Sequence, residues 1–203
     1  MLKTLFTLLA LIPLYVTAEY KNTNGKAIDK SIKDLIRWQR NQKKPVLASI
    51  EVSNEWQLID FEEADNYMIW IGHSTFLIKK NNLTILTDPV FSDRASPFKR
   101  FGPKRLIPPS ITIEELPPID VVTISHNHYD HLDIRSLKKL SKANPDLIFL
   151  IPEGDLDIFK KRNIPNVTEF DWWEDIAIDK FLFTFTPVQH WSARGLFDRN
   201  ESL

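Results

Sequence analysis

The chain has 203 residues, of which 43% are hydrophobic and 26% are charged, a balance typical of a globular domain large enough to bury a core. The formal net charge is −1 and the two signs are interspersed, so the chain lacks the basic face that neutralises nucleic-acid phosphates. The absence of cysteine excludes a disulfide framework and a thiolate zinc site. Any transition metal must therefore be bound by histidine and carboxylate side chains.

The first eighteen residues differ from the rest of the chain. Lys3 precedes an apolar run from residue 5 to residue 16, and Ala18 supplies a small residue before Glu19. This pattern predicts a signal peptide at 1–18 and an exported protein, periplasmic or secreted, whose association with a membrane is left open. The run is shorter than the roughly 20 apolar residues of a membrane span, but an uncleaved anchor remains the alternative.

An N-terminal extension is predicted at 19–66, ahead of the main domain at 67–203. The extension is expected to contain an amphipathic helix, because four apolar residues recur at helical spacing before Pro45: Ile28, Ile32, Leu35 and Ile36.

The main domain shows the pattern of an α/β protein. Alternating apolar residues indicate strands at 67–71, 75–78 and 83–87, with a turn at Asn81-Asn82, so we expect an antiparallel meander. The stretch 97–118 is rich in proline and is expected to be a long ordered loop. Strands and helices then alternate, which indicates α/β layering. In order, we expect strand 120–125, helix 134–143, strand 147–151, helix 156–162, strand 167–170 and strand 181–186.

The apolar strand 120–125 leads directly into His126-Asn127-His128-Tyr129-Asp130-His131. Because side chains two residues apart in an extended chain point the same way, His126 and His128 can bind one ion, and Asp130 and His131 can reach a second. Neutral imidazole and carboxylate are the ligands that zinc accepts when no thiolate is available. The alternative is a surface loop that happens to be rich in histidine, but the apolar strand before it favours a metal site.

Three further candidates lie at strand ends. His190 follows strand 181–186 and is the expected third imidazole for the first ion. Asp88 follows strand 83–87; it can accept the second N–H of a ligand histidine, or cap a turn before proline. His73 lies between two strands and either faces the metal cleft or hydrogen-bonds within the sheet.

Several short blocks of sequence, taken together and in order, are more specific than the histidine motif alone. They are Trp70-Ile71-Gly72-His73-Ser74-Thr75, Leu86-Thr87-Asp88-Pro89-Val90-Phe91-Ser92, Arg94-Ala95-Ser96-Pro97, Gly102-Pro103-Lys104-Arg105, Leu116-Pro117-Pro118-Ile119-Asp120, residues 126–133, Asp171-Trp172-Trp173-Glu174, Phe185-Thr186-Pro187 and Gln189-His190-Trp191. The His-x-His-x-Asp-His element by itself is typical of the metallo-β-lactamase superfamily. All the blocks together resemble the N-acylphosphatidylethanolamine-hydrolysing phospholipase D family, from about residue 67 to the C-terminus.

This resemblance implies a metallo-β-lactamase αββα sandwich with two zinc ions. His126, His128 and His190 would hold one ion and Asp130 and His131 the other, with Asp130 the candidate catalytic residue. In such a site a bridging hydroxide attacks phosphorus. The implied activity is therefore phospholipase D-type cleavage of N-acylphosphatidylethanolamine-like phospholipids. The implied partners are a phospholipid-like substrate and a membrane surface, without nucleic acid; a homo-oligomer is left open.

The family pattern continues beyond this chain. Family members add a metal-bridging Asp, usually within Gly-Asp-Thr-Gly, and a final His, and neither follows His190 here. We therefore expect a C-terminally truncated domain, holding the N-terminal half of the sandwich and the start of the second. One complete zinc site, an uncovered sheet face and no activity of its own are the expected consequences. Two alternatives stay open: a hydrolase of a lactone, thioester or amide on the same fold, or a catalytically incompetent zinc-binding fragment.

Overall fold

The computed structural model describes residues 20–26, 32–41, 51–195 and 198–202. The predicted signal peptide and Ile28 lie outside the described residues. Helix α1 (Ile32–Asn41) is present within the N-terminal extension, as the remaining apolar positions predicted. Within the described ranges, none of the helices has the length and apolar character needed to cross a membrane.

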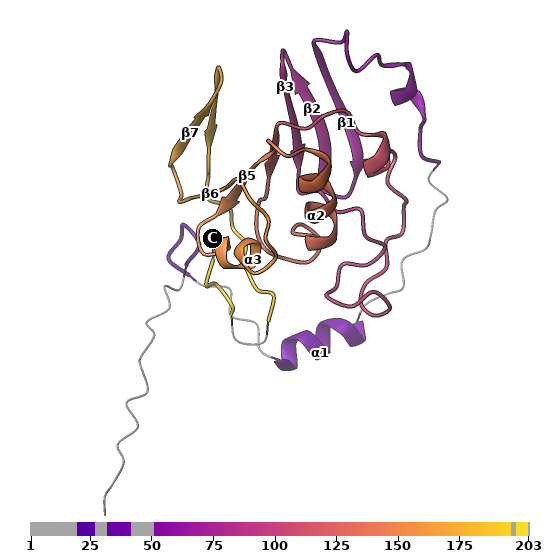
Figure 1. The fold of residues 1–203 in the computed structure, drawn as a ribbon. Helices are drawn as coiled ribbons and strands as arrows, with labels where there is room; N and C mark the ends of the chain where they lie inside the picture. Colours follow the sequence, from indigo (N-terminus) through magenta and orange to yellow (C-terminus); the bar gives the residue numbers. More distant parts are fainter. Residues whose placement is uncertain (1–19, 27–31, 42–50, 196–197, 203) are drawn as a thin grey trace, which may run out of the picture.

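Six strands form one mixed sheet in the order β1-β2-β3-β4-β5-β6 (Figure 1). The predicted meander is confirmed, since the first three strands pair antiparallel: β1 (Asn66–Gly72), β2 (Thr75–Lys80) and β3 (Leu83–Thr87). The next three pair parallel: β4 (Val121–Thr123), β5 (Ile148–Pro152) and β6 (Val167–Phe170). Parallel neighbours need long crossovers. The loop 88–120 with the 3-10 helix η2 (Ile113–Glu115), helix α2 (Ile134–Ala143) and helix α3 (Leu156–Lys160) supply them.

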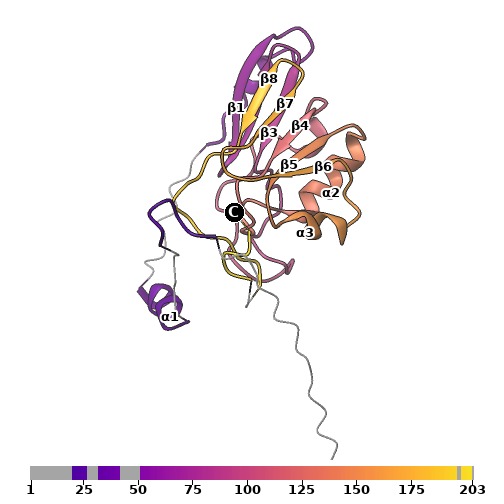
Figure 2. The same cartoon turned by 90° about the vertical axis from the view of Figure 1, so that its left-hand side faces the viewer.

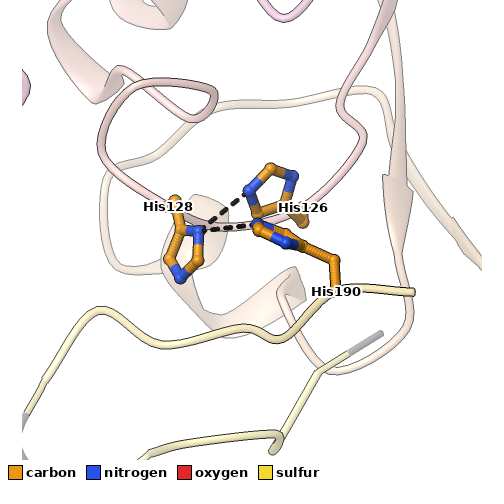
Figure 3. Close-up of side chains that lie close together, drawn as sticks. All are labelled: His126, His128 and His190. Carbon is orange, nitrogen blue, oxygen red and sulfur yellow. Dashed lines mark hydrogen bonds between the residues drawn. The ribbon is translucent and has the colours of Figure 1, made fainter. Parts of the chain in front are cut away.

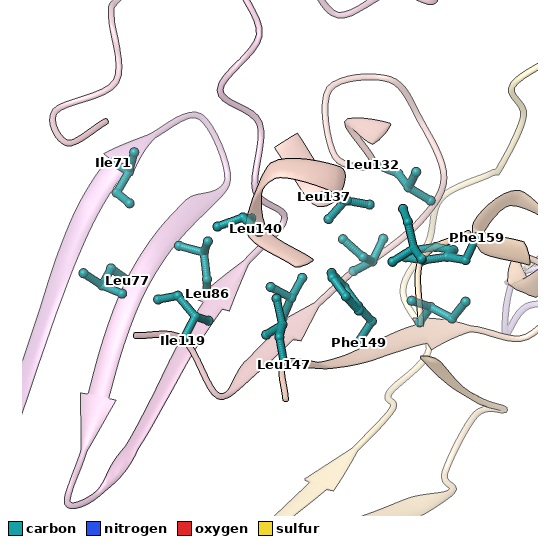
Figure 4. Close-up of a cluster of buried hydrophobic side chains, with 14 of the residues drawn as sticks. Ile71, Leu77, Leu86, Ile119, Leu132, Leu137, Leu140, Leu147, Phe149 and Phe159 are labelled. Carbon is teal, nitrogen blue, oxygen red and sulfur yellow. The ribbon is translucent and has the colours of Figure 1, made fainter. Parts of the chain in front are cut away.

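Strands β4 and β5 are buried on both faces of the sheet. Val122, Phe149 and Ile151 belong to the main core. In this core Phe149 lies with Leu137 of α2 and Phe159 of α3 (Figure 4). Because side chains alternate along a strand, their neighbours in β4 and β5 point to the opposite face.

A second, smaller core lies on that opposite face. Val121 and Leu150 pack there with Leu83 and Phe170, under a hairpin of β7 (Asp175–Ile178) and β8 (Phe181–Thr184). In the second view the hairpin is drawn in front of the first strands of the sheet, while α2 and α3 lie next to β5 and β6 (Figure 2). The expectation of an uncovered inner face is thus wrong for this region, because aromatic residues of the hairpin cover it.

Two predicted strands end earlier than the apolar pattern indicated. β4 stops at Thr123 because the amide of Ser125 donates to the side chain of Asp88, at 2.7 Å, instead of to a neighbouring strand. β8 stops at Thr184, although the amide of Phe185 still donates to the carbonyl of Glu174. Strand β7 was not predicted from the sequence. Its residues alternate in burial, and Asp179, with a φ of 52°, makes the turn to β8.

Candidate metal centre

The topology brings three strand ends to one edge of the sheet. β1 and β3 run in the same direction because each is antiparallel to β2, and β4 is parallel to β3. The residues that follow these strands, His73, Asp88 and His126, therefore lie together. Gly72 and His73 have φ values of 143° and 50°, and a register shift between Trp70 and Gly72 accompanies this tight turn.

His126, His128 and His190 form the first group of ligand-competent side chains, each offering a nitrogen within 4.8 Å of the others (Figure 3). Nδ1 of His128 lies 2.9 Å from Nε2 of His126 and 3.3 Å from Nε2 of His190. Two residues from the loop after β4 and one residue from the segment after β8 thus point at a common centre.

The hydrogen bonds around His126 show why this centre fits a cation. Oγ of Ser125 donates to Oδ2 of Asp88 at 2.7 Å, so its lone pair is free to accept from Nδ1 of His126, 3.0 Å away. A neutral imidazole carries one proton, so this arrangement leaves a lone pair on Nε2. That lone pair faces the other two imidazoles, and a metal ion is the partner that satisfies all three nitrogens.

The surroundings keep these imidazoles neutral. Burial, followed by the proximity of the other histidines, lowers the pKa of His126 to about 2. Burial and the nearby His190 lower the pKa of His128 to about 4, and burial also lowers the pKa of His190. Neutral imidazole is the form that ligates zinc, so the site is prepared for a metal across the physiological pH range.

His73, Asp130 and His131 form a second group, again within 4.8 Å of one another. Oδ2 of Asp130 lies 3.1 Å from Nε2 of His73 and 3.7 Å from Nε2 of His131. The imidazole rings of His126 and His131 are 4.0 Å apart between centroids, so the two groups adjoin. The sequence led us to expect one complete group of ligands in this chain. The structure gathers two, because the turn after β1 directs His73 into the cleft.

Asp88 is the shared support of both groups. It is 6% exposed, and its carboxylate accepts hydrogen bonds from the amide of Ser125 at 2.7 Å and from Nδ1 of His131 at 2.8 Å. The second bond places the proton of His131 on Nδ1 and leaves Nε2 free for the second centre. Through Oγ of Ser125, the same carboxylate fixes the tautomer of His126. Asp88 thus makes the hydrogen bond to His131 that a support of a candidate ligand histidine requires.

Sequence reasoning missed three residues that hold the ligands in place. Ser125 carried a weak signal, as a hydroxyl at the end of an apolar strand. Arg194 donates to the carbonyls of Asn127 and Leu132 at 2.6 and 2.8 Å, which ties down both ends of the histidine loop. Asn22 accepts from the amide of His190 at 2.9 Å across 168 positions of sequence. Neither Arg194 nor Asn22 lies in a pattern that could have revealed its role.

The fold and the gathered histidines define a domain of the β-lactamase type. A family profile described as "Beta-lactamase superfamily domain" matches residues 83–203, and this chain belongs to that superfamily. The resemblance noted in the sequence is thereby confirmed at this level.

The chain is also similar to individual curated proteins. N-acyl-phosphatidylethanolamine-hydrolyzing phospholipase D 1 of Caenorhabditis elegans is 37% identical over 150 residues, which is 70% of this chain and 42% of the relative. The mitochondrial enzyme of the same description from Saccharomyces cerevisiae is 39% identical over 141 residues, 68% of this chain and 30% of that one. An uncharacterized protein of Mycobacterium tuberculosis is 40% identical over 138 residues, 66% of this chain and 36% of that protein. The chain therefore spans less than half the length of these relatives.

Proposed function

We propose that this chain provides the metal-binding part of a zinc-dependent phosphodiesterase that cleaves N-acylphosphatidylethanolamine-like phospholipids in the manner of a phospholipase D. The observation that carries the proposal is the pair of adjoining ligand groups around His126 and His131. Paired metal sites suit displacement at phosphorus, because two ions can stabilise both the attacking and the leaving oxygen. Two of the relatives are named for this phospholipase reaction.

In this proposal some residues bind metal and others position the metal-binding residues. His126, His128 and His190 would hold one zinc ion, and His73, Asp130 and His131 the other. Bound zinc would acidify water and polarise a phosphoryl oxygen. Asp88 orients His131 directly and His126 through Ser125, while Arg194 holds the histidine loop against the segment that carries His190.

A cavity beside the first ligand group favours a lipid over a small polar ester. It has a volume of about 440 Å³ and lies between the large sheet and the β7–β8 hairpin. Apolar and aromatic side chains line much of it, among them Leu150, Phe170, Phe183 and Phe185, while His126 and His190 form part of its wall. Such a cavity suits the hydrocarbon part of a substrate whose polar part reaches the metals.

Metal content is the first test of the proposal. The chain should bind two zinc ions, as measured by equilibrium dialysis and elemental analysis. His128→Ala should remove the first, and His73→Ala or Asp130→Asn should remove or strongly weaken the second. Asp146→Asn is a matched control, since this carboxylate is exposed and outside both groups. Unchanged zinc content in His128→Ala would refute the assignment.

Turnover is the second test. N-acylphosphatidylethanolamine should be hydrolysed by a protein in which the matching part of the C. elegans relative is replaced by this chain, and EDTA should abolish that activity. The 203-residue chain alone is expected to show no turnover above a metal-free control. Hydrolysis of a lactone, thioester or amide without phosphodiester cleavage would establish the alternative enzyme. Zinc binding without turnover in either form would establish a non-catalytic module.

A further inference from the structure

The loop between β3 and β4 carries an exposed tip. Every residue from 97 to 104 is exposed to solvent. Phe98 and Phe101 are 63% and 72% exposed, and Leu106, just beyond the tip, is 60% exposed. Large apolar side chains gathered on one short segment are a mark of an interaction surface, whereas single exposed apolar residues are ordinary. Both ribbon views draw this magenta-to-pink loop below the large sheet and above helix α1 (Figures 1 and 2).

The charge of the loop is entirely of one sign. Five basic residues and no acidic residue lie between positions 94 and 106: Arg94, Lys99, Arg100, Lys104 and Arg105. The three nearest the tip, Lys99, Arg100 and Lys104, are exposed. The chain as a whole has a net charge of −1, so this segment is much more basic than the rest of the chain. Aromatic residues interleaved with basic ones match a surface that is anionic outside and apolar just beneath, which is the chemistry of an anionic phospholipid membrane.

The base of the loop is rigidly built. The guanidinium of Arg94 donates to the carbonyl of Gly102 at 2.6 Å, and Arg94 and Lys104 form an antiparallel bridge. Gly102 has a φ of 97°, and a Cβ there would lie 2.5 Å from Cβ of Ser96, so only glycine fits. Arg135 in α2 donates to the carbonyl of Ser96 at 2.9 Å. A preformed tip loses little conformational entropy when it binds.

The loop also stands beside the candidate metal centre. The guanidinium of Arg105 donates to the carbonyls of Val90 and Ser92. Its Nη1 lies 3.2 Å from the position that a Cβ on Gly72 would occupy. Gly72 immediately precedes His73, so the root of the loop touches the turn that supplies a residue of the second ligand group.

We propose that residues 97–106 form a membrane-contact loop that docks the protein on anionic phospholipid. Phe98, Phe101 and Leu106 enter the headgroup region, while the exposed basic side chains face lipid phosphates. The inference does not depend on the proposed phosphodiesterase activity, since the contact is measured without turnover.

The absence of cysteine allows a direct test at a single labelled position. Phe101→Cys carries an environment-sensitive fluorophore in the full chain. Leu58→Cys is the control, because Leu58 is 86% exposed and lies near acidic residues such as Glu55 and Glu62. Vesicles of phosphatidylcholine with about one third phosphatidylglycerol should shift the emission of the loop label to the blue and leave the Leu58 label unchanged. No shift at position 101, or an equal shift at both positions, would overturn the proposal.

Charge reversal tests the basic residues separately. In the Phe101→Cys background, Lys99→Glu with Arg100→Glu should raise the lipid concentration for half-maximal shift by at least about tenfold, since each basic residue near an anionic surface contributes about fivefold. Lys160→Glu with Lys161→Glu, an exposed pair at the end of α3, should leave it unchanged. All variants are prepared with the same N-terminus, so any affinity of residues 1–18 for lipid cannot produce the difference. Equal binding by the loop variant and the α3 variant would refute the assignment to this loop.

Discussion

Replacing Asp88 with asparagine isolates the contribution of the carboxylate that supports both ligand groups. Asp88 accepts three hydrogen bonds of 2.7–2.8 Å, two from Ser125 and one from Nδ1 of His131. An asparagine of the same shape has only one acceptor oxygen, so its NH2 group must face one of these donors. His131 can avoid that clash by moving its proton to Nε2, but the ring then presents N–H to the second metal.

Loss of such a supporting carboxylate weakens metal binding about 10- to 100-fold, or about 1.4–2.7 kcal/mol. We expect Asp88→Asn to show this loss at the second centre and a smaller loss at the first, which Asp88 reaches only through Ser125. Zinc affinity would be measured by competition with a chromophoric chelator, with Asp146→Asn as the control. Thermal unfolding of the metal-free protein would show whether the variant is still folded. A second-site affinity within about twofold of the parent chain would refute this reasoning.

The other predictions concern the positioning of His190, pH dependence and export. Asn22→Ala removes the acceptor for the amide of His190 and should weaken the first zinc about 5- to 10-fold in the same titration, whereas the exposed Asn24→Ala should not. Burial raises the pKa of Asp155 from 3.8 to about 6, so the folded chain keeps a proton that the unfolded chain has lost, and stability should fall as pH rises between these values. Asp155→Asn should remove up to about 2–3 kcal/mol of that dependence in urea unfolding; an unchanged pH profile would contradict it. Finally, N-terminal sequencing of the expressed protein should begin at Glu19, and an intact Met1 on a cytosolic species would count against export.

The sequence was sufficient to predict features that depend on local pattern. The β1–β3 meander follows from alternation around Asn81-Asn82, and helix α2 begins and ends where its apolar period does. The segment 126–131 could be singled out because an apolar strand leads into closely spaced histidines, and a chain without cysteine has few other metal ligands. In each case the signal lies within about a dozen residues, so no knowledge of distant contacts is required.

The tertiary structure decided what depends on distant segments meeting. The turn after β1 directs His73 toward Asp130, the N-terminal extension supplies Asn22 to His190, and the hairpin of β7 and β8 covers a face that the sequence left open. None of these contacts produces a periodic pattern in the sequence, because each joins residues that are far apart along the chain. The physical reason is that these contacts form only where buried polar groups find hydrogen-bond partners and apolar surfaces are covered. Those conditions arise when several strands and loops meet in the folded protein, and no single strand contains them.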